Sequence, residues 1–311
     1  MLPRFVFLAA LAISARVFAL DAGNHEFRIR SGGLERHYLV HVPPKVAGRP
    51  ALILNFHGGG ANAREQQRYA RMDALADREG FLVAYPDGTG PVVGRFLTWN
   101  AGACCGAAAG AQADDVGFVR ALLDDLSRRM AYDPARVYAT GLSNGAMMSY
   151  RLAAELSERI AAIAPVAGSM VLVRFSPPRG VPVLHIHSVD DPRALYEGGL
   201  GAPFPITGTR VLHPPVEERL AQWARMNGCG PEPAATDERE WKAPSGNLHT
   251  ATLYLYPRCR VETALWKLTG AGHVWPGGIL GYLTWLLGPG TRVIDANEEM
   301  WRFFSRHRLA K

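Results

Sequence analysis

The chain has 311 residues, of which 48% are hydrophobic and 20% are charged. That composition is ordinary for a globular protein with a sizeable core, and the length allows one large domain or two ordinary ones. The formal net charge is +6, but the lysines and arginines form no cluster of the kind that nucleic-acid-binding proteins carry. A nucleic-acid partner is therefore not expected.

The first residues differ from the rest of the chain. Residues 1–4 form a short basic start, residues 5–13 are apolar but too few to span a bilayer, and residues 17–19 are small or apolar, as a cleavage site requires. We predict a secretory signal peptide over 1–19 and a protein that is secreted, either extracellular or periplasmic. The alternatives are an uncleaved amphipathic anchor and a buried first helix.

The remaining chain, 20–311, contains no internal repeat, low-complexity tract or long linker, so we predict a single domain without a tethered binding module. Apolar runs and alternation indicate strands at 26–30, 36–43, 50–60, 81–88, 136–143, 161–168, 182–188, 248–256 and 261–269. Helical periodicity indicates helices at 63–80, 116–130, 144–156, 216–229 and 297–308. This alternation predicts an α/β fold with a mostly parallel central sheet flanked by helices on both faces.

Four cysteines in an exported chain suggest disulfides. We favour a bridge between Cys229 and Cys259, while the adjacent Cys104 and Cys105 form either a vicinal disulfide or a reduced pair. Adjacent cysteines do not have the spacing of metal ligands, and the sequence contains no C-x-x-C pair that could complete a site with them. We therefore expect no metal.

The run from Gly141 to Gly145 reads G-x-S-x-G at a predicted junction between strand and helix. A serine at such a turn is held in strained backbone with its hydroxyl exposed above the sheet, and the flanking glycines leave room for the turn. Ser143 is therefore the candidate nucleophile. A hydroxyl is a weak nucleophile, so a base, an orienting acid and an oxyanion site must be found elsewhere.

Residues 57–60 read H-G-G-G after the third predicted strand. In hydrolases with a nucleophile elbow, one oxyanion donor is the N–H of the residue after the serine, here Asn144, and the other comes from this loop. We favour Gly59 as the second donor and keep Gly60 as its alternative.

The acid and the base are expected later in the chain. Asp190 and Asp191 end the predicted strand 182–188, at the edge of an open sheet where sites form, and we favour Asp191 as the acid. His273 lies in a glycine-bounded loop after a late strand, where an imidazole can take the serine proton. The order Ser143, Asp191, His273 is that of α/β-hydrolases.

Aromatic and apolar side chains near these motifs are candidates for the substrate pocket. We expect His57, Trp99 and Trp275 to contact substrate, because such pockets are mainly apolar and aromatic; the alternative for the tryptophans is simple loop packing. The apolar run 278–287 forms either a hydrophobic lip beside the site or a buried helix.

Together, HGGG, TWNAGACCG, DDVGFV, GLSNGAMMSY, HSVDDP and GHVWPGG resemble the polyhydroxybutyrate depolymerases and the related secreted feruloyl esterases. The resemblance implies an α/β-hydrolase serine esterase without a cofactor, in which Ser143, Asp191 and His273 form the triad. The acid motif of that family reads like HGTADP, whereas Ser188, Val189 and Asp190 stand here, so Asp190 stays an alternative to Asp191.

The expected reaction is hydrolysis of a carboxylic ester through an acyl-enzyme. The substrate is either a hydroxycinnamoyl ester on a polysaccharide or a short hydroxyalkanoate ester. The motifs do not distinguish the two classes, because loops such as 88–113 and 193–235 set the choice of acyl group. The alternatives are a non-catalytic ligand-binding protein on a hydrolase scaffold and a serine peptidase of similar fold.

Overall fold

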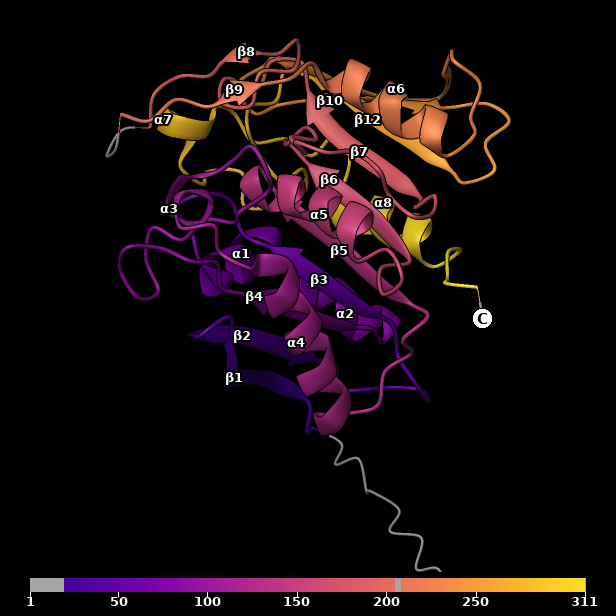
Figure 1. The fold of residues 1–311 in the computed structure, drawn as a ribbon. Coiled ribbons are helices and arrows are strands. Elements are labelled where there is room, and N and C mark those ends of the chain that lie inside the picture. The colour runs from indigo at the N-terminus through magenta and orange to yellow at the C-terminus, as the bar shows by residue number, and fades with distance from the viewer. Residues whose placement is uncertain (1–19, 205–207, 311) are drawn as a thin grey trace, which may run out of the picture.

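The structure is a computed structural model that describes residues 20–204 and 208–310 (Figure 1). The predicted signal peptide lies outside these residues. Within them, none of the helices has the length and hydropathy needed to cross a bilayer.

A ten-stranded sheet runs through the molecule in the order β1-β2-β4-β3-β5-β6-β7-β12-β11-β10. From β4 to β12 in that order the neighbouring strands are parallel, and antiparallel strands complete both edges. The strands are β1 Gly23–Ser31, β2 Leu34–Val42, β3 Leu52–Phe56, β4 Leu82–Pro86, β5 Val137–Leu142, β6 Ala162–Val166, β7 Val183–Ser188, β10 Ala234–Lys242, β11 Leu248–Leu255 and β12 Thr263–Thr269, with β8 Gly199–Leu200 and β9 Leu212–His213 paired separately.

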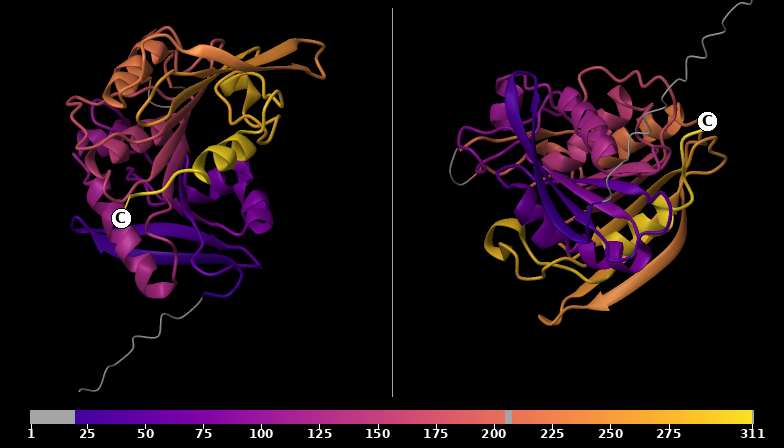
Figure 2. Two further views of the ribbon diagram at one scale, coloured as in Figure 1. Left: turned by 90° about the vertical axis from the view of Figure 1, so that its right-hand side faces the viewer. Right: turned by 90° about the horizontal axis from the view of Figure 1, so that it is seen from below.

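Helices cover both faces of this sheet (Figure 2). They are α1 Ala63–Ala70, α2 Met72–Glu79, α3 Gly106–Gly110, α4 Asp115–Arg129, α5 Asn144–Glu155, α6 Val216–Met226, α7 Thr284–Leu287 and α8 Ala296–Phe304. One hydrophobic core lies between the sheet and the helices α4, α5 and α6, and a second lies between the sheet and α1, α2 and α8. The central parallel strands are buried along their whole length because both of their faces are covered.

The predicted α/β architecture is confirmed, but the single helix expected over 63–80 is wrong. The chain forms α1 and α2 with a break at Arg71, whose φ of 56° is left-handed. The carbonyl oxygen of Ala70 accepts a hydrogen bond of 2.8 Å from the side chain of Asn297 in α8. This contact comes from a residue far along the chain, so helical periodicity carries no sign of it.

Three further expectations are resolved by the structure. The bridge between Cys229 and Cys259 is present, and Cys104 and Cys105 are bonded to each other rather than reduced. The run 278–287 contains only the short helix α7, which has no buried residue, so the alternative of a buried helix is wrong. The strand β10 is not among the predicted elements; it is rich in charged residues and lies at an outer edge of the sheet, where exposed and half-buried side chains alternate along most of it.

Candidate active site

The turn at Ser143 has the geometry expected of a nucleophile elbow. Ser143 adopts φ 57° and ψ −116°, a conformation that costs a non-glycine residue energy and persists only where its surroundings impose it. The end of β3 presses against the turn from below: a Cβ on Gly141 would lie 2.6 Å from the carbonyl oxygen of Phe56, and a Cβ on Gly145 would collide with the same oxygen. Both glycines of the motif are therefore required by the close approach of β3.

The residues expected to form the site end neighbouring parallel strands. Ser143 follows β5, Asp191 follows β7 and His273 follows β12, and these strands lie in the order β5-β6-β7-β12. Parallel neighbours have their carboxyl ends at one edge of the sheet, so the three residues share that edge. The loops at this edge, which carry α3, α7, β8 and β9, lie together at the left of Figure 1.

Asp191 and His273 are in direct contact. Oδ2 of Asp191 lies 2.7 Å from Nδ1 of His273, and both side chains are buried. Oδ1 of Asp191 accepts hydrogen bonds from the backbone N–H groups of Arg193 (2.7 Å) and Ala194 (2.8 Å). A carboxylate accepts only, so Nδ1 of His273 carries a proton.

The charge of Asp191 is held in place by these donors. Burial alone would raise the pKa of the carboxyl, but the charge of His273 and the hydrogen bonds from His187 and His273 outweigh it and hold the pKa well below its usual range. Asp191 is therefore ionised at neutral pH.

Asp190 has a different partner from its neighbour. Its Oδ2 accepts a hydrogen bond of 2.6 Å from the backbone N–H of Gly270, at the start of the loop that carries His273. Asp191 is therefore the residue that contacts His273, whereas Asp190 helps to hold the loop that carries His273.

The two glycines that compete as oxyanion donors are distinguished by their hydrogen bonds. The N–H of Gly60 donates to the carbonyl oxygen of Leu97 at 2.8 Å, so it is already used. A Cβ on Gly59 would lie 3.7 Å from the Cβ of Asn144, which places Gly59 against the start of α5. Asn144 is the first residue of α5, where an N–H has no partner inside the helix. Gly59 and Asn144 therefore present the better pair of donors.

Trp99 ties the two donor segments together. Its indole N–H donates to the carbonyl oxygen of His57 at 3.1 Å, beside the glycine loop. Its backbone N–H donates to Oδ1 of Asn144 at 2.7 Å, and its carbonyl oxygen accepts from Nδ2 of Asn144 at 3.0 Å. We name this set of three hydrogen bonds the Trp99 clamp.

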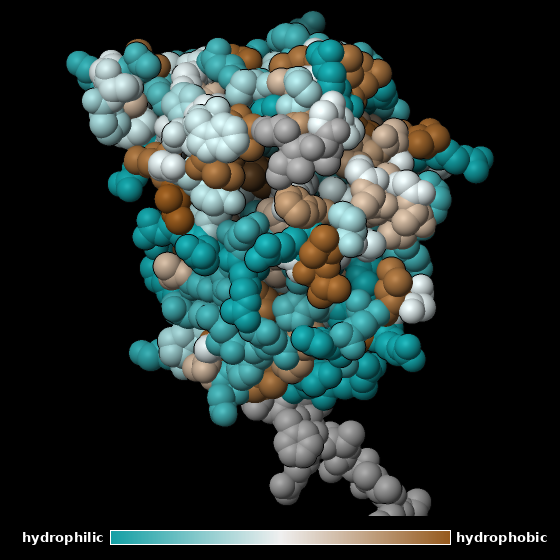
Figure 3. All heavy atoms as spheres, turned by 90° about the vertical axis from the view of Figure 1, so that its left-hand side faces the viewer, coloured by the Kyte–Doolittle hydropathy of each residue, from teal (hydrophilic) through white to brown (hydrophobic). Residues whose placement is uncertain are grey.

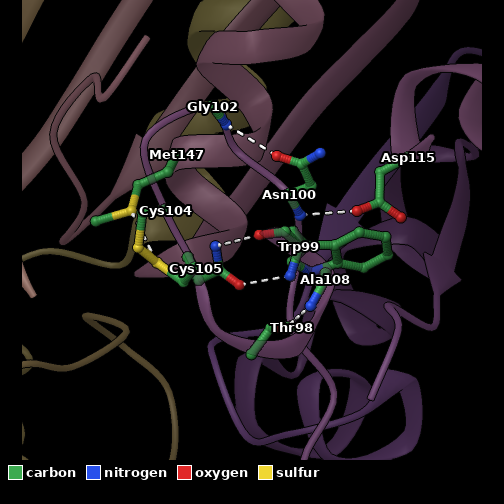
Figure 4. The surroundings of a disulfide bond; sticks show 10 residues. Thr98, Trp99, Asn100, Gly102, Cys104, Cys105, Ala108, Asp115 and Met147 are labelled. Atoms are coloured by element: carbon green, nitrogen blue, oxygen red, sulfur yellow. Dashed lines mark hydrogen bonds between the residues drawn. A yellow bond between two sulfur atoms is a disulfide. The ribbon is translucent and has the colours of Figure 1, made fainter. Parts of the chain in front are cut away.

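The loop around the clamp is itself fixed at both ends (Figure 4). The backbone N–H of Asn100 donates to Oδ2 of the buried Asp115 at 2.8 Å, and the N–H of Cys105 donates to the carbonyl oxygen of Trp99 at 3.0 Å. The disulfide of Cys104 and Cys105 packs against Met147, one turn into α5. The loop is thus held against the helix that begins at the candidate nucleophile.

Comparison with known proteins identifies the family. The family model described as Esterase PHB depolymerase matches residues 36–213. The chain belongs to this family. The putative esterase NocK of Nocardia uniformis subsp. tsuyamanensis is 31% identical over 285 residues, covering 88% of this chain and 80% of NocK. Feruloyl esterase B of Piromyces equi is 28% identical over 256 residues, covering 79% of this chain but only 44% of the longer relative.

A solved structure supports the same fold. The acetyl xylan esterase from Aspergillus awamori matches with a TM-score of 0.55 and 16% sequence identity, over 90% of this chain and 99% of that one. At that identity the likeness shows the fold alone, and it confirms the α/β-hydrolase architecture.

Three residues of this family member that were expected to contact substrate have other contacts. Trp99 is 0% exposed. His57 is buried, accepts from the N–H of Gly88 at Nε2 (3.0 Å) and donates to the carbonyl oxygen of Gly58 from Nδ1 (2.8 Å). Burial lowers the pKa of His57 to about 4. Trp275 is buried in the core beside α8, and its indole N–H donates to Asn297 at 3.0 Å.

The burial of these side chains favours the alternative of loop packing for the two tryptophans, and all three side chains position loops of the esterase. His57 and Trp99 hold the glycine loop, and Trp275 holds the loop of His273. Large aromatic side chains with a polar tip find a hydrogen-bond partner when buried, as the indoles of Trp99 and Trp275 do here.

Exposed apolar side chains lie instead on the loops around the strand ends. Hydrophobic residues line part of a hollow on the face shown in Figure 3. The backbone N–H of His273 donates to the carbonyl oxygen of Leu287 at 2.6 Å, so the segment containing α7 supports the base loop directly. Trp285 in α7 is 74% exposed, consistent with the predicted lip.

Several residues of the site were not singled out from the sequence. Asp115, the side chain of Asn144 and the pair His185 and His187 all make buried hydrogen bonds at or behind the site. The histidines carried one usable signal, since their spacing of two along a strand places them on one face. In the described ranges, no group of three or more His, Cys, Asp and Glu side chains is placed to hold a metal ion.

The Trp99 clamp makes a prediction for stability. Asn144→Ala keeps the backbone donor but leaves the buried N–H of Trp99 unpaired and removes one of the two donors to its carbonyl oxygen, the other being the N–H of Cys105. We therefore expect the free energy of unfolding to fall by about 2 to 4 kcal/mol. Chemical denaturation measures it. The exposed Asn247→Ala is the matched control, with an expected change under about 0.5 kcal/mol. Equal stability of the two variants would contradict the clamp.

Proposed function

We propose that the chain is a secreted serine carboxylester hydrolase whose residues 20–311 form one catalytic domain. The nucleophile is Ser143, the base is His273 and the acid is Asp191. The observation that carries the proposal is the 2.7 Å contact between Asp191 and His273, made at the sheet edge that also bears the strained turn of Ser143. Membership of an esterase family supports the same reading.

In the proposed reaction Ser143 Oγ attacks the ester carbonyl carbon while its proton passes to Nε2 of His273. Nδ1 of His273 keeps its proton toward Asp191, which stabilises the imidazolium. The N–H groups of Gly59 and Asn144 donate to the oxyanion, an interaction of about 3 to 4 kcal/mol per donor in comparable sites. The ester C–O bond then breaks and His273 protonates the leaving alkoxide. In the second half of the reaction, water attacks the acyl carbon while His273 takes its proton, and His273 then returns a proton to Ser143 Oγ as the acid product leaves.

The proposed substrates are a hydroxycinnamoyl ester on a polysaccharide or a short hydroxyalkanoate ester. The relative named feruloyl esterase B favours the first class, and the family description favours the second. Turnover of methyl ferulate, acetylated xylan and soluble hydroxybutyrate oligomers, measured side by side, ranks them.

Export of the protein is supported by its two disulfides, because such bonds persist in oxidising compartments. In this proposal residues 1–19 are the signal peptide that directs it there.

A fluorophosphonate probe tests the proposed chemistry. We expect covalent labelling of one residue, with mass spectrometry of the digest locating the adduct on Ser143, because the probe reacts only with an activated serine. A non-catalytic binding protein on this scaffold would stay unlabelled, and an adduct on another serine would reassign the nucleophile.

A further inference from the structure

A row of hydrogen-bonded side chains continues from Asp191 into the core. His187 Nε2 lies 3.3 Å from Oδ2 of Asp191, and His187 Nδ1 lies 3.1 Å from Nε2 of His185. His185 Nδ1 in turn lies 3.0 Å from the hydroxyl of Tyr150. The two histidines share one face of β7 because they are two residues apart, and Tyr150 reaches them from α5, which packs on that face.

The acceptors at one end of this row determine where each proton lies. His187 Nε2 faces two groups that only accept, Oδ2 of Asp191 and the carbonyl oxygen of Ala194 at 2.8 Å, so Nε2 carries the proton. The Nδ1 of a neutral His187 then accepts from Nε2–H of His185, whose Nδ1 accepts from the hydroxyl of Tyr150. The opposite direction would turn a bare nitrogen toward the carboxylate.

The row also holds the turn that presents the carboxylate. Ala194 donates its N–H to Oδ1 of Asp191 at 2.8 Å and accepts from His187 with its carbonyl oxygen. One imidazole therefore contacts both the carboxylate and the end of its turn. All members of the row are buried, so water cannot replace a lost partner, and a deletion leaves its neighbour unpaired.

We propose that His187 is a positioning residue of the triad, held in one tautomer by His185 and Tyr150, and that it fixes the orientation in which Asp191 accepts from His273. This inference rests on the proposed function, because it assigns His187 to the support of a catalytic Asp191. His187 itself touches neither the reacting serine nor the ester.

Other ionisable groups surround the Asp191 carboxylate and His187. They come from β7, α5, β9, the loop after β12 and the loop after β7, and they are His185, Tyr150, His213, His273, Arg193 and Tyr196. Burial, with the charge of His273, lowers the pKa of His213 to about 4, and burial puts the pKa of His185 well below its usual range. These two imidazoles are therefore neutral at neutral pH.

The tautomers test the row without any reference to activity. In protein labelled with ¹⁵N-histidine, two-bond nitrogen–proton correlation spectra distinguish Nε2–H from Nδ1–H imidazoles. We expect His185 and His187 both as Nε2–H and His273 as Nδ1–H. His187 observed as the neutral Nδ1–H form would overturn the proposal, even if Ser143 proves to be the nucleophile.

Kinetics test the positioning role. For His187→Leu we expect kcat for an aryl acetate to fall about 10- to 100-fold, the range seen when the partner that orients a functional histidine is lost, with KM changed less than about twofold. The acid limb of the pH profile should move to higher pH. Without His187, the negative charge of Asp191 is shared with one donor fewer, so Asp191 stabilises the protonated form of His273 more strongly.

Two further variants separate positioning from general packing. His187→Gln can place an amide donor near the lost Nε2–H, so we expect it to recover most of kcat and the original acid limb. His41→Leu removes a buried histidine of β2 that contacts Asn24 in β1 and Asp77 in α2, outside the proposed site. It should leave kcat and the acid limb unchanged. Wild-type kcat and pH profile in His187→Leu, or equal losses in the Leu and Gln variants, would overturn the proposal.

If the His187 variants fail to fold, Tyr150→Phe still tests the row, because this substitution removes only the hydroxyl at its far end. We expect His185 to stay in the Nε2–H form while the ¹⁵N shift of its Nδ1 moves, because that nitrogen loses the hydroxyl that donates to it, and the fold, followed by circular dichroism, to persist. An unchanged His185 signal would contradict the row. Fluorophosphonate labelling of Ser143 in the same sample reports separately on the proposed function.

Discussion

Replacing Ser143 with alanine is expected to lower kcat for an aryl acetate by about a millionfold, the cost of losing the nucleophile in a comparable triad. Without the hydroxyl no acyl-enzyme forms, and the oxyanion donors can assist only the direct attack of water. KM should change little, since the substrate still meets the same loops. Steady-state kinetics on p-nitrophenyl acetate, with active-site titration to detect traces of wild-type protein, measure the loss.

Ser149→Ala is the matched control for this variant. Ser149 lies in the same helix, is buried, and its hydroxyl donates to the carbonyl oxygen of Gly145 at 3.0 Å. It has no place in the proposed reaction, so we expect turnover within about threefold of wild type, the effect of one lost hydrogen bond. Retention of more than about one per cent of activity in Ser143→Ala would remove Ser143 from the mechanism.

Asp191→Asn is expected to reduce kcat by about ten-thousandfold. The amide can turn its NH₂ toward His273 and so favour the tautomer whose proton sits on Nε2, which cannot accept the proton of Ser143. Asp190→Asn serves as the control; it keeps an acceptor for Gly270, and we expect a loss below about tenfold. A reversed ranking of the two variants in kcat would assign the acid to Asp190.

Asp191→Asn also leads to a prediction of how the free energy of unfolding depends on pH. The pKa of Asp191 lies below its usual range in the folded protein, so the unfolded chain binds this proton more readily. Its contribution to folding is therefore present above about pH 4 and is lost as the pH falls toward the lowered value. Denaturation at pH 7 and pH 3 should show a smaller difference between wild type and Asp191→Asn at the lower pH.

Much of the architecture could be predicted because each central element has a local signal. The apolar runs that become β3, β5 and β7 are buried on both faces. Chain order and the sheet rule were enough to bring Asp191 to His273. These inferences depend on periodicity and on motifs, which a sequence displays directly.

What could not be predicted depends on contacts between distant residues. The break at Arg71 accompanies a hydrogen bond from Asn297, and the burial of Trp99 depends on Asn144 and His57. A tryptophan in a loop rich in glycine and alanine reads equally as a pocket wall or as an anchor, and only the partner of its indole N–H decides. His185 and His187 were not singled out for the same reason, since only their buried partners show that they stand behind Asp191.

The Trp99 clamp has a consequence for how new specificities can arise in this esterase. Thr89 and Thr98 exchange two backbone hydrogen bonds of 2.9 Å each, which close the base of the segment 90–97 just before the clamp. The segment carries the exposed Val93 and Phe96. Leu97 at its end accepts a hydrogen bond from the N–H of Gly60 at 2.8 Å, so the base of the segment is fixed to the glycine loop. We therefore expect that residues 91–96 can change in length and composition by insertion or grafting while the two proposed oxyanion donors, Gly59 and Asn144, keep their spacing. Evolution, or a protein engineer, can therefore vary the surface formed by residues 91–96 without altering the residues of the proposed triad.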